Sequence, residues 1–194
     1  MRTLLILVGI GLLLGFYGCA QNNKLVAADE HVKKQWADVE GAYQRRADLV
    51  PQLVNTVKGA ANYEKSTLES VVQARAKATS VTLDASKLND PQAVQKFEQA
   101  QTELSASLGR LIATREAYPD LKANAAFTGL MSQLEGTENR INVERRKYNE
   151  AVEGYNTMVR SFPTSVVAGI KHFDAKVPFK ATTAGAEKAP EVKF

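Results

Sequence analysis

The sequence predicts an all-α fold, an antiparallel coiled-coil-like bundle of three to four long helices behind an N-terminal membrane segment. Two observations indicate this class. Apolar residues recur at intervals of three, four and seven through residues 22–173, which is the period of amphipathic helices. An uncharged apolar run precedes them at residues 4–20. With 44% hydrophobic and 24% charged residues, the chain of 194 residues has the composition of a folded protein with one core.

The run over residues 4–20, LLILVGIGLLLGFYGCA, lies at the short end of the length that spans a bilayer. A retained single-pass helix would place Phe16 and Tyr17 at the membrane interface, where aromatic rings are favoured. A lipoprotein signal would make Cys19 the acylated N-terminal residue. Simple cleavage would require small residues where Phe16 and Tyr17 stand. We therefore expect residues 1–21 to be a membrane anchor or signal-like segment, with Cys19 as the candidate lipidation site.

Basic residues on the two sides of the apolar run bear on which side of the membrane the helices lie. Arg2 precedes the apolar run, and Lys24, Lys33 and Lys34 follow it within the distance over which basic residues bias topology. These charges nearly balance. The signal-like start and Cys19 favour the extracytoplasmic side of the bacterial inner membrane, with a single N-terminal crossing.

A long first helix is expected from Lys24 onward, continuous with the membrane segment or close behind it. Its apolar stripe consists of Leu25, Val32, Trp36, Val39, Tyr43, Val50, Leu53 and Val57. Pro51 lies inside this stripe, where it removes a backbone hydrogen bond and clashes with the preceding turn. The sequence therefore predicts a kink or a break near Leu49, and the continuation of the apolar stripe across Pro51 favours the kink.

Two further helices are delimited by turn and capping signals. Residues 63–79 have an apolar side and a charged side, and residues 80–91 collect Asp, Asn and Ser residues that favour turns. Asp90 followed by Pro91 is typical of a helix start. The helix that begins there should end before Pro119, because proline disfavours a helical conformation in the residue before it.

The last long helix has the most regular pattern. Its seven-residue repeat consists of Phe127, Leu134, Ile141, Tyr148, Tyr155 and Phe162. Such a repeat is typical of coiled coils. In the middle of the helix, polar residues occupy positions that should be apolar, namely Thr137, Glu138, Glu144 and Arg145. The helix interface is therefore predicted to be polar at its centre.

The C-terminal part divides at Asp174. A short apolar helix within residues 164–173 should either pack on the bundle or lie at a membrane surface. From Asp174 the composition shifts to Lys, Ala, Thr, Pro and Glu without periodicity, which is typical of disorder. The expected organisation is an anchor at residues 1–21, a helical bundle at 22–173 and a disordered tail at 174–194.

Several stretches resemble the LemA family of bacterial membrane proteins. They are RRADLVPQLVNTVKG at residues 45–59, AYPDLKAN at 117–124, LEGTENRI at 134–141 and RRKYNEAVEGYN at 145–156, with Glu64 and Ala74-Arg75 among them. The resemblance runs from about Asn22 to Phe173. Departures are Gln52 for Asn, Ala60 for Tyr, Tyr63 for His, and Gln21-Asn22 for a Tyr-Asn pair. The resemblance implies an anchored helical bundle without an established biochemical activity.

Charged residues on the first and last long helices form the strongest candidate site. The cluster consists of Arg45, Arg46, Asp48, Glu135, Glu138, Arg140 and Arg145, accompanied by Glu144 and Arg146. If these helices are neighbours, Arg and carboxylate side chains can pair inside an otherwise apolar interface. Such pairs either fix the register of the helices or form a polar groove for a ligand or partner.

The sequence lacks the residue patterns of common enzyme and metal sites. His31 and His172 are the only histidines, neither follows a Glu by three residues, and Cys19 is the only cysteine, so di-iron and zinc sites are not expected. No Gly-x-Ser-x-Gly elbow and no glycine-rich phosphate loop occurs. Lys and Arg alternate with Glu, so the net charge of +4 does not predict nucleic-acid binding. We expect no catalytic residues, no cofactor and no metal.

These expectations combine into a non-enzymatic scaffold or interaction protein anchored in the bacterial cell envelope. Its partners would be the membrane and other membrane or envelope proteins. The alternative is an envelope accessory factor that binds substrates of a membrane protease or chaperone, or modulates it. The surfaces available for that role are the polar cluster and a bend at residues 60–64.

Overall fold

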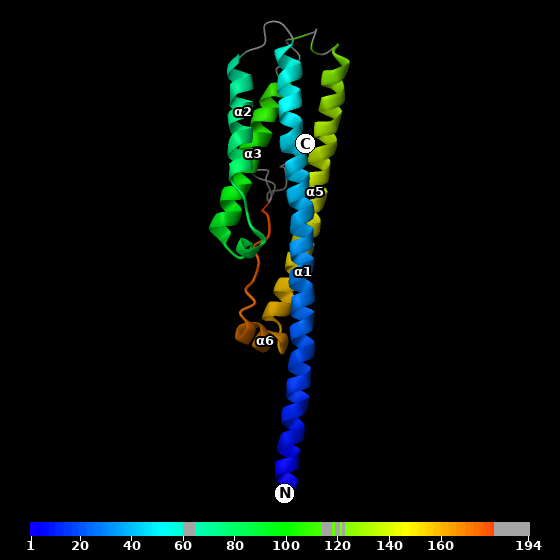
Figure 1. The fold of residues 1–194 in the computed structure, drawn as a ribbon, viewed down its shortest axis with the longest axis vertical. Coiled ribbons are helices and arrows are strands. Elements are labelled where there is room, and N and C mark those ends of the chain that lie inside the picture. Colours follow the sequence, from blue (N-terminus) through cyan, green and yellow to red (C-terminus); the bar gives the residue numbers. More distant parts are fainter. Residues whose placement is uncertain (60–64, 114–117, 119–120, 122, 181–194) are drawn as a thin grey trace, which may run out of the picture.

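The computed structural model describes residues 1–59, 65–113, 118, 121 and 123–180 (Figure 1). The helices are α1 (Arg2–Lys58), α2 (Lys65–Ser80), the short 3-10 helix η1 (Ala85–Lys87), α3 (Pro91–Ala113), α5 (Ala125–Arg160) and α6 (Thr164–Lys171). No strand occurs within these described ranges, and the predicted all-α class is confirmed. The predicted bend at residues 60–64 and the predicted helix end before Pro119 fall on residues outside the described part.

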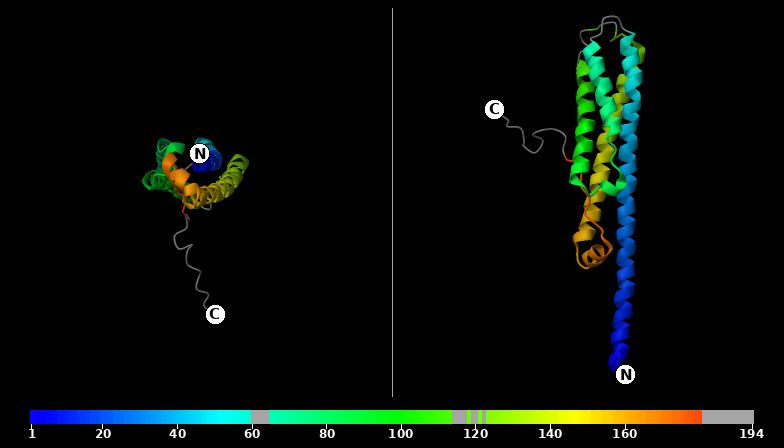
Figure 2. Two further views of the ribbon diagram at one scale, coloured as in Figure 1. Left: turned by 90° about the horizontal axis from the view of Figure 1, so that it is seen from below. Right: turned by 60° about the vertical axis from the view of Figure 1, so that its left-hand side comes forward.

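The long helices lie side by side and run alternately up and down (Figures 1 and 2). α1 packs along α5, and α2 packs against α3 and α1. α6 lies at the lower end of the packed helices, in contact with α1 and α5. The N-terminal part of α1 projects beyond that end, and we call residues 1–20 the arm. The packed remainder, from residue 21 to residue 180, is called the helical body.

The residues before α3 and α5 explain where these helices begin. The Asp90 carboxylate accepts hydrogen bonds from the backbone N–H groups of Gln92 and Ala93, as its predicted role at the start of α3 requires. Asn124 caps α5 in the same way, since its side-chain oxygen accepts from the N–H groups of Ala126 and Phe127. Each cap satisfies backbone donors that have no partner in the first helical turn.

The core consists of two apolar clusters stacked along the helices. The cluster nearer the arm is aromatic, with the Trp36 ring edge-on to Phe97 at a centroid distance of 5.3 Å and to Tyr148 at 5.9 Å. The cluster farther from the arm is mainly aliphatic, with Leu53 and Leu104 fully buried. Both clusters draw on α1, α3 and α5, so they hold the long helices together by burial of apolar surface.

The seven-residue repeat of α5 agrees with the core except at its last position. The buried members are Phe127, Leu134, Ile141, Tyr148 and Tyr155. Phe162 is 84% exposed, so its predicted place in the helix interface is wrong. The reason is local, because α5 ends at Arg160 and the chain turns at Ser161 before α6.

Of the two alternatives predicted near Leu49, the break is wrong, because α1 continues as one helix through Pro51. The kink stays a prediction. Proline has no N–H, so the carbonyl of Ala47, four residues earlier, loses its helical partner. The structure shows what replaces that partner. Arg75 of α2 donates from Nε to the Ala47 carbonyl oxygen at 2.8 Å. A side chain of a neighbouring helix thus satisfies the acceptor that Pro51 leaves open.

The first residues of the predicted tail are ordered. Residues 174–180 lie along the helical body in an extended conformation, and Phe179 is only 5% exposed within the aromatic cluster. The prediction of disorder from Asp174 is therefore wrong for this stretch. Residues 181–194 lie outside the described residues.

Residues 4–20, predicted as a membrane segment, form the beginning of α1 in the arm. Described side chains such as Leu5, Leu12 and Phe16 are exposed there. In the part of the chain that the structure describes, no helix combines the length and the apolar character needed to cross a membrane.

Exchanging Arg75 for Met should lower the free energy of unfolding by about 1–3 kcal/mol, because the Ala47 carbonyl then remains buried without a donor. In a Pro51→Ala background the same exchange should cost less, since the restored N–H at position 51 serves that carbonyl. Urea unfolding of the four proteins, followed by circular dichroism, measures this coupling.

Lys77→Met is the control for that cycle. Lys77 forms an exposed ion pair with Glu103, and its removal should cost about 0.5 kcal/mol or less in either background. If Arg75→Met lowers the free energy of unfolding equally with and without Pro51, the hydrogen bond does not compensate for the proline.

Candidate functional site

Arg46 of α1 is the most deeply buried charged residue of the predicted cluster, with 1% of its surface exposed. Its Nη1 donates to Ser105 Oγ and, at 2.7 Å, to Glu138 Oε1. Its Nη2 donates to the backbone oxygen and to Oε1 of Gln101 at 3.1 and 2.7 Å. One guanidinium group therefore bonds to α3 and to α5 from α1.

Gln101 extends this network to a fourth helix, because its Nε2 donates to the Ala78 carbonyl of α2 at 3.2 Å. We call Arg46, Gln101, Ser105 and Glu138 the polar layer. It lies between the two apolar clusters, which follow directly along α1, α3 and α5 on either side of it. Every long helix contributes to the layer or accepts a hydrogen bond from it.

The polar layer contains one permanently charged guanidinium group, that of Arg46, and one carboxylate, that of Glu138. Glu138 is the carboxylate within ion-pair distance of Arg46, and its side chain is 40% exposed. The Tyr43 ring lies 5.1 Å from Arg46 Cζ, which adds a cation–π contact. Within the described residues, Arg46 Nε has no hydrogen-bond partner. Burial raises the pKa of the Tyr43 hydroxyl, and the positive charges of Arg145 and Arg46 offset part of that rise.

Only part of the predicted cluster comes together. The structure pairs Arg46 with Glu138, as expected for neighbouring first and last helices. Four other predicted residues are exposed and lie apart from the polar layer, namely Arg45, Asp48, Glu135 and Arg140. Asp48 accepts from Gln44 on its own helix, and Arg140 lies 3.8 Å from the buried Glu144. The predicted single cluster is therefore divided among separate sites.

Arg145 belongs to a different site, nearer the arm. Its Nη2 lies 3.0 Å from Glu98 Oε1 of α3 and donates to the Lys180 carbonyl at 2.8 Å. Its Cζ lies 4.6 Å from the centroid of the Phe179 ring. Burial raises the pKa of Glu98, while the charge of Arg145 acts in the opposite direction. Arg145 thus joins α5 to α3 and to the extended residues after α6.

Two asparagines of α5 hold the extended residues through the backbone. Asn149 accepts from the N–H of Phe179 and donates to its carbonyl, at 2.8 and 3.0 Å. Asn156 makes the same pair of bonds with Lys176, both at 2.8 Å. We call residues 174–180 the clamped segment. Because both bonds at each position involve backbone atoms, this mode of holding a chain does not depend on its side chains.

Side chains of the clamped segment add further contacts. The Tyr148 hydroxyl donates to the Val177 carbonyl at 3.0 Å, and Lys176 Nζ lies 3.1 Å from Asp29 of α1. Burial acts to raise the pKa of Asp29, but Lys33 and Lys176 outweigh it and hold that pKa below its ordinary value. The clamped segment therefore bonds to α5 and to α1.

Sequence reasoning missed Glu98, Asn149 and Asn156. Asn149 and Asn156 are seven residues apart, each directly after a residue of the coiled-coil repeat, and this spacing is visible in the sequence. Since the segment after Asp174 has no periodicity, nothing in the sequence indicated a partner for these amides. The sequence did not single out Glu98, because a charged residue directly after a core residue is common on amphipathic helices.

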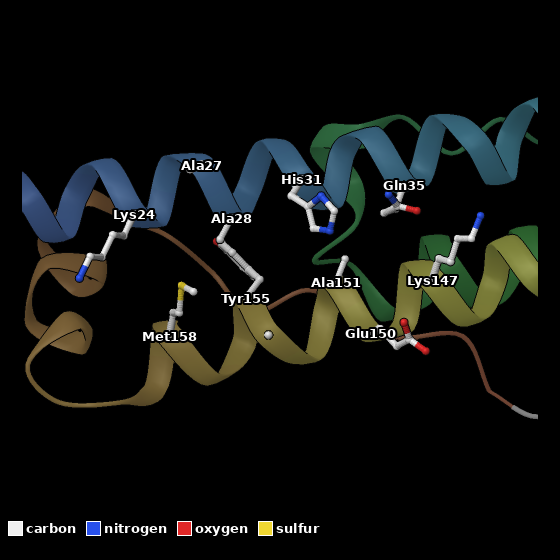
Figure 3. A pocket seen from close by; sticks show the side chains of 11 residues that line it. Lys24, Ala27, Ala28, His31, Gln35, Lys147, Glu150, Ala151, Tyr155 and Met158 are labelled. Carbon is white, nitrogen blue, oxygen red and sulfur yellow. The ribbon is translucent and has the colours of Figure 1, made fainter.

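An open pocket of about 700 Å³ lies between α1 and α5 (Figure 3). His31 and Gln35 line it from α1, and Lys147 and Tyr155 line it from α5. Gln35 Oε1 is buried without a hydrogen-bond partner among the described atoms. The described residues contain no group of three His, Cys, Asp or Glu side chains placed to hold a metal ion. The pocket offers polar contacts from both helices.

The LemA family profile matches residues 35–194, which include the polar layer, Arg145 and the clamped segment. The chain belongs to the LemA family. A LemA protein from Metamycoplasma hominis is 22% identical over 153 residues, which cover 79% of this chain and 66% of that protein. The family match and this relative agree with the resemblance found in the sequence.

Magnetosome proteins share a shorter stretch. MamQ 2 from Paramagnetospirillum magneticum is 33% identical and MamQ from Magnetospirillum gryphiswaldense 30% identical, each over 79 residues or 41% of this chain. The chain spans 29% of the length of each of these two proteins. What they share with it is therefore a part of each protein and not a whole protein.

Arg46→Met should lower the free energy of unfolding by about 2–4 kcal/mol, because Gln101 and Ser105 lose their partner while Glu138 retains some contact with solvent. The neighbouring Arg45→Met is the matched control and should change that free energy by about 0.5 kcal/mol or less, since Arg45 is exposed. Urea unfolding measures both. Similar small effects of the two exchanges would contradict the structural role of Arg46.

Replacing both Asn149 and Asn156 with Ala should release the clamped segment while leaving the long helices folded. Hydrogen exchange measured by mass spectrometry should show faster exchange at the Lys176 and Phe179 amides, whose acceptors are removed. Asn139→Ala is the control, since Asn139 is exposed on the same helix. Unchanged protection of residues 176–179 in the double variant would argue against the clamp.

Proposed function

We propose that the chain is a non-enzymatic scaffold or interaction protein of the bacterial cell envelope. In this proposal the helical body is an antiparallel, coiled-coil-like bundle that the arm attaches to the inner membrane. The observation that carries the proposal is the polar layer. In this layer the guanidinium group of Arg46 bonds to the surrounding helices and does not face an open cavity. Such an arrangement suits a helical body that keeps one shape while its outer surface contacts a partner.

Membrane attachment is supported by the arm. Residues 4–20 carry no charge, and the exposed large side chains of this part are Leu4, Leu5, Ile6, Leu7, Leu12, Leu13, Phe16 and Tyr17. Exposed apolar surface of this extent favours a lipid environment. The attachment is either the retained helix or an acyl chain at Cys19, with cleavage of the segment as the third alternative. The signal-like start favours a helical body outside the cytoplasm.

The scaffold role is supported by the chemistry of the sites. The buried guanidinium, the clamping amides and the ion pair of Arg145 with Glu98 all bond within the chain. The magnetosome relatives are named for a cell structure and not for a reaction. By analogy, we propose partners among membrane or envelope proteins, with no metal, cofactor or nucleic acid.

A second function is favoured by the clamped segment. Asn149 and Asn156 hold an extended chain through its backbone, which is the kind of contact that binds unfolded polypeptides of varied sequence. An envelope factor that binds substrates of a membrane protease or chaperone would need such a surface. In that case the clamped segment would occupy the binding site in the absence of a substrate.

Photo-crosslinking in intact membranes distinguishes the scaffold role from the substrate-binding role. A photoreactive residue in place of His31, in the pocket between α1 and α5, should yield one discrete product if the protein is a scaffold with a stable partner. The same residue in place of Val72, exposed on α2, is the control and should yield none of that product.

A spread of products that increases when unfolded envelope proteins accumulate would instead support substrate binding, above all if it arises from position 153, which is exposed on α5 between Asn149 and Asn156. Absence of products from positions 31 and 153 would contradict an interaction function for these surfaces. Turnover of ester, peptide or phosphate substrates by the purified protein would contradict the non-enzymatic proposal.

A further inference from the structure

Next to the arm, α6 carries apolar side chains on its outer face. Val166 and Ile170, four residues apart and therefore on one side of the helix, are 54% and 69% exposed. Phe162, two residues before the start of α6, is exposed as well. On the other side, Ala168 is buried against the body. We call Phe162, Val166 and Ile170 the α6 face.

The position of α6 along α1 is set by a direct contact. Thr164 Oγ1 donates to Oε1 of Gln21, the first residue of the helical body after the arm. Tyr17 lies four residues before Gln21, or about 6 Å at the rise of an α-helix. The view from below in Figure 2 shows α6 across the end of the body from which the arm projects. The start of α6 therefore lies within about one helical turn of the end of the arm.

The charges around the α6 face suit a bilayer with anionic lipids. Lys24, Arg160 and Lys171 are exposed at the same end of the helical body, while Asp174 is the exposed acid nearest α6 in the sequence. An apolar helix face bordered by basic residues is typical of helices that lie in the membrane interface. A second copy of the chain would have to cover this face while avoiding two projecting arms. A lipid surface meets the arm and the α6 face together.

We propose that the α6 face inserts into the headgroup region of the same membrane that holds the arm. The proposal rests on membrane attachment of the arm, and it adds a second contact point. One inserted helix leaves the body free to tilt and to turn about its axis. A second apolar contact beside it restricts both motions and fixes which side of the body faces away from the membrane.

The test uses the full chain with Cys19→Ser and one new cysteine that carries an environment-sensitive bimane label. The variants Val166→Cys and Ile170→Cys report on the α6 face, and Leu12→Cys reports on the arm. Val72→Cys on α2 is the matched control, because Val72 is 47% exposed. Each protein is reconstituted into vesicles of phosphatidylethanolamine and phosphatidylglycerol that contain lipids with a quenching nitroxide at a shallow or a deep acyl position.

Shallow nitroxides should quench the labels at positions 166 and 170 roughly twofold or more, as expected for side chains at the headgroup boundary. Deep nitroxides should quench position 12, and position 72 should remain unquenched. Labels at 166 and 170 that behave like position 72, while position 12 is quenched, would overturn the α6 contact and leave the anchor intact. Loss of quenching at position 12 as well would overturn both the α6 contact and the retained helix as the anchor. Blue-shifted but unquenched labels at 166 and 170 would show that protein covers the face, which also overturns the proposal.

Discussion

The buried guanidinium of Arg46 is the interaction on which the helical body depends. A cation removed from water is costly unless partners compensate for the hydration that it loses. Here a carboxylate of α5, a hydroxyl and an amide of α3, and an aromatic ring of α1 surround it. These partners can meet only when the helices have one relative register. The two apolar clusters supply most of the favourable burial, and the polar layer between them restricts how the clusters can align.

Side chains also replace missing backbone partners at Pro51 and at the clamped segment. In each case a side chain from another element forms the hydrogen bond that backbone atoms would form in a regular helix or sheet. Arg75 replaces the missing donor at the Ala47 carbonyl, and Asn149 replaces the neighbouring strand that Phe179 lacks. The body therefore accepts a proline inside its longest helix and an extended chain on its surface. This explains why polar side chains are placed inside an otherwise apolar arrangement.

Much of the fold follows from periodicity, because the repeat from Phe127 to Tyr155 and the cap at Asp90 depend on local spacing. The contacts of long range were not predictable in the same way. Arg46 and Arg45 are adjacent and carry the same guanidinium group, and the predicted cluster contained both, although only Arg46 is buried. Helix continuity at Pro51 depends on Arg75 in another helix, and order after Asp174 depends on amides of α5. A pattern within one segment does not identify a partner in a distant one.

The central claim is that the polar layer makes α1, α2, α3 and α5 one cooperative unit. Native-state hydrogen exchange in increasing, sub-denaturing urea tests it most directly, residue by residue. We predict that the amides beside the layer share one free energy of opening and one dependence of that free energy on urea concentration. These amides lie in α1 near Arg46, in α3 near Gln101 and in α5 near Glu138. Opening of α2 and α3 at a lower free energy, while α1 and α5 remain protected, would contradict this claim.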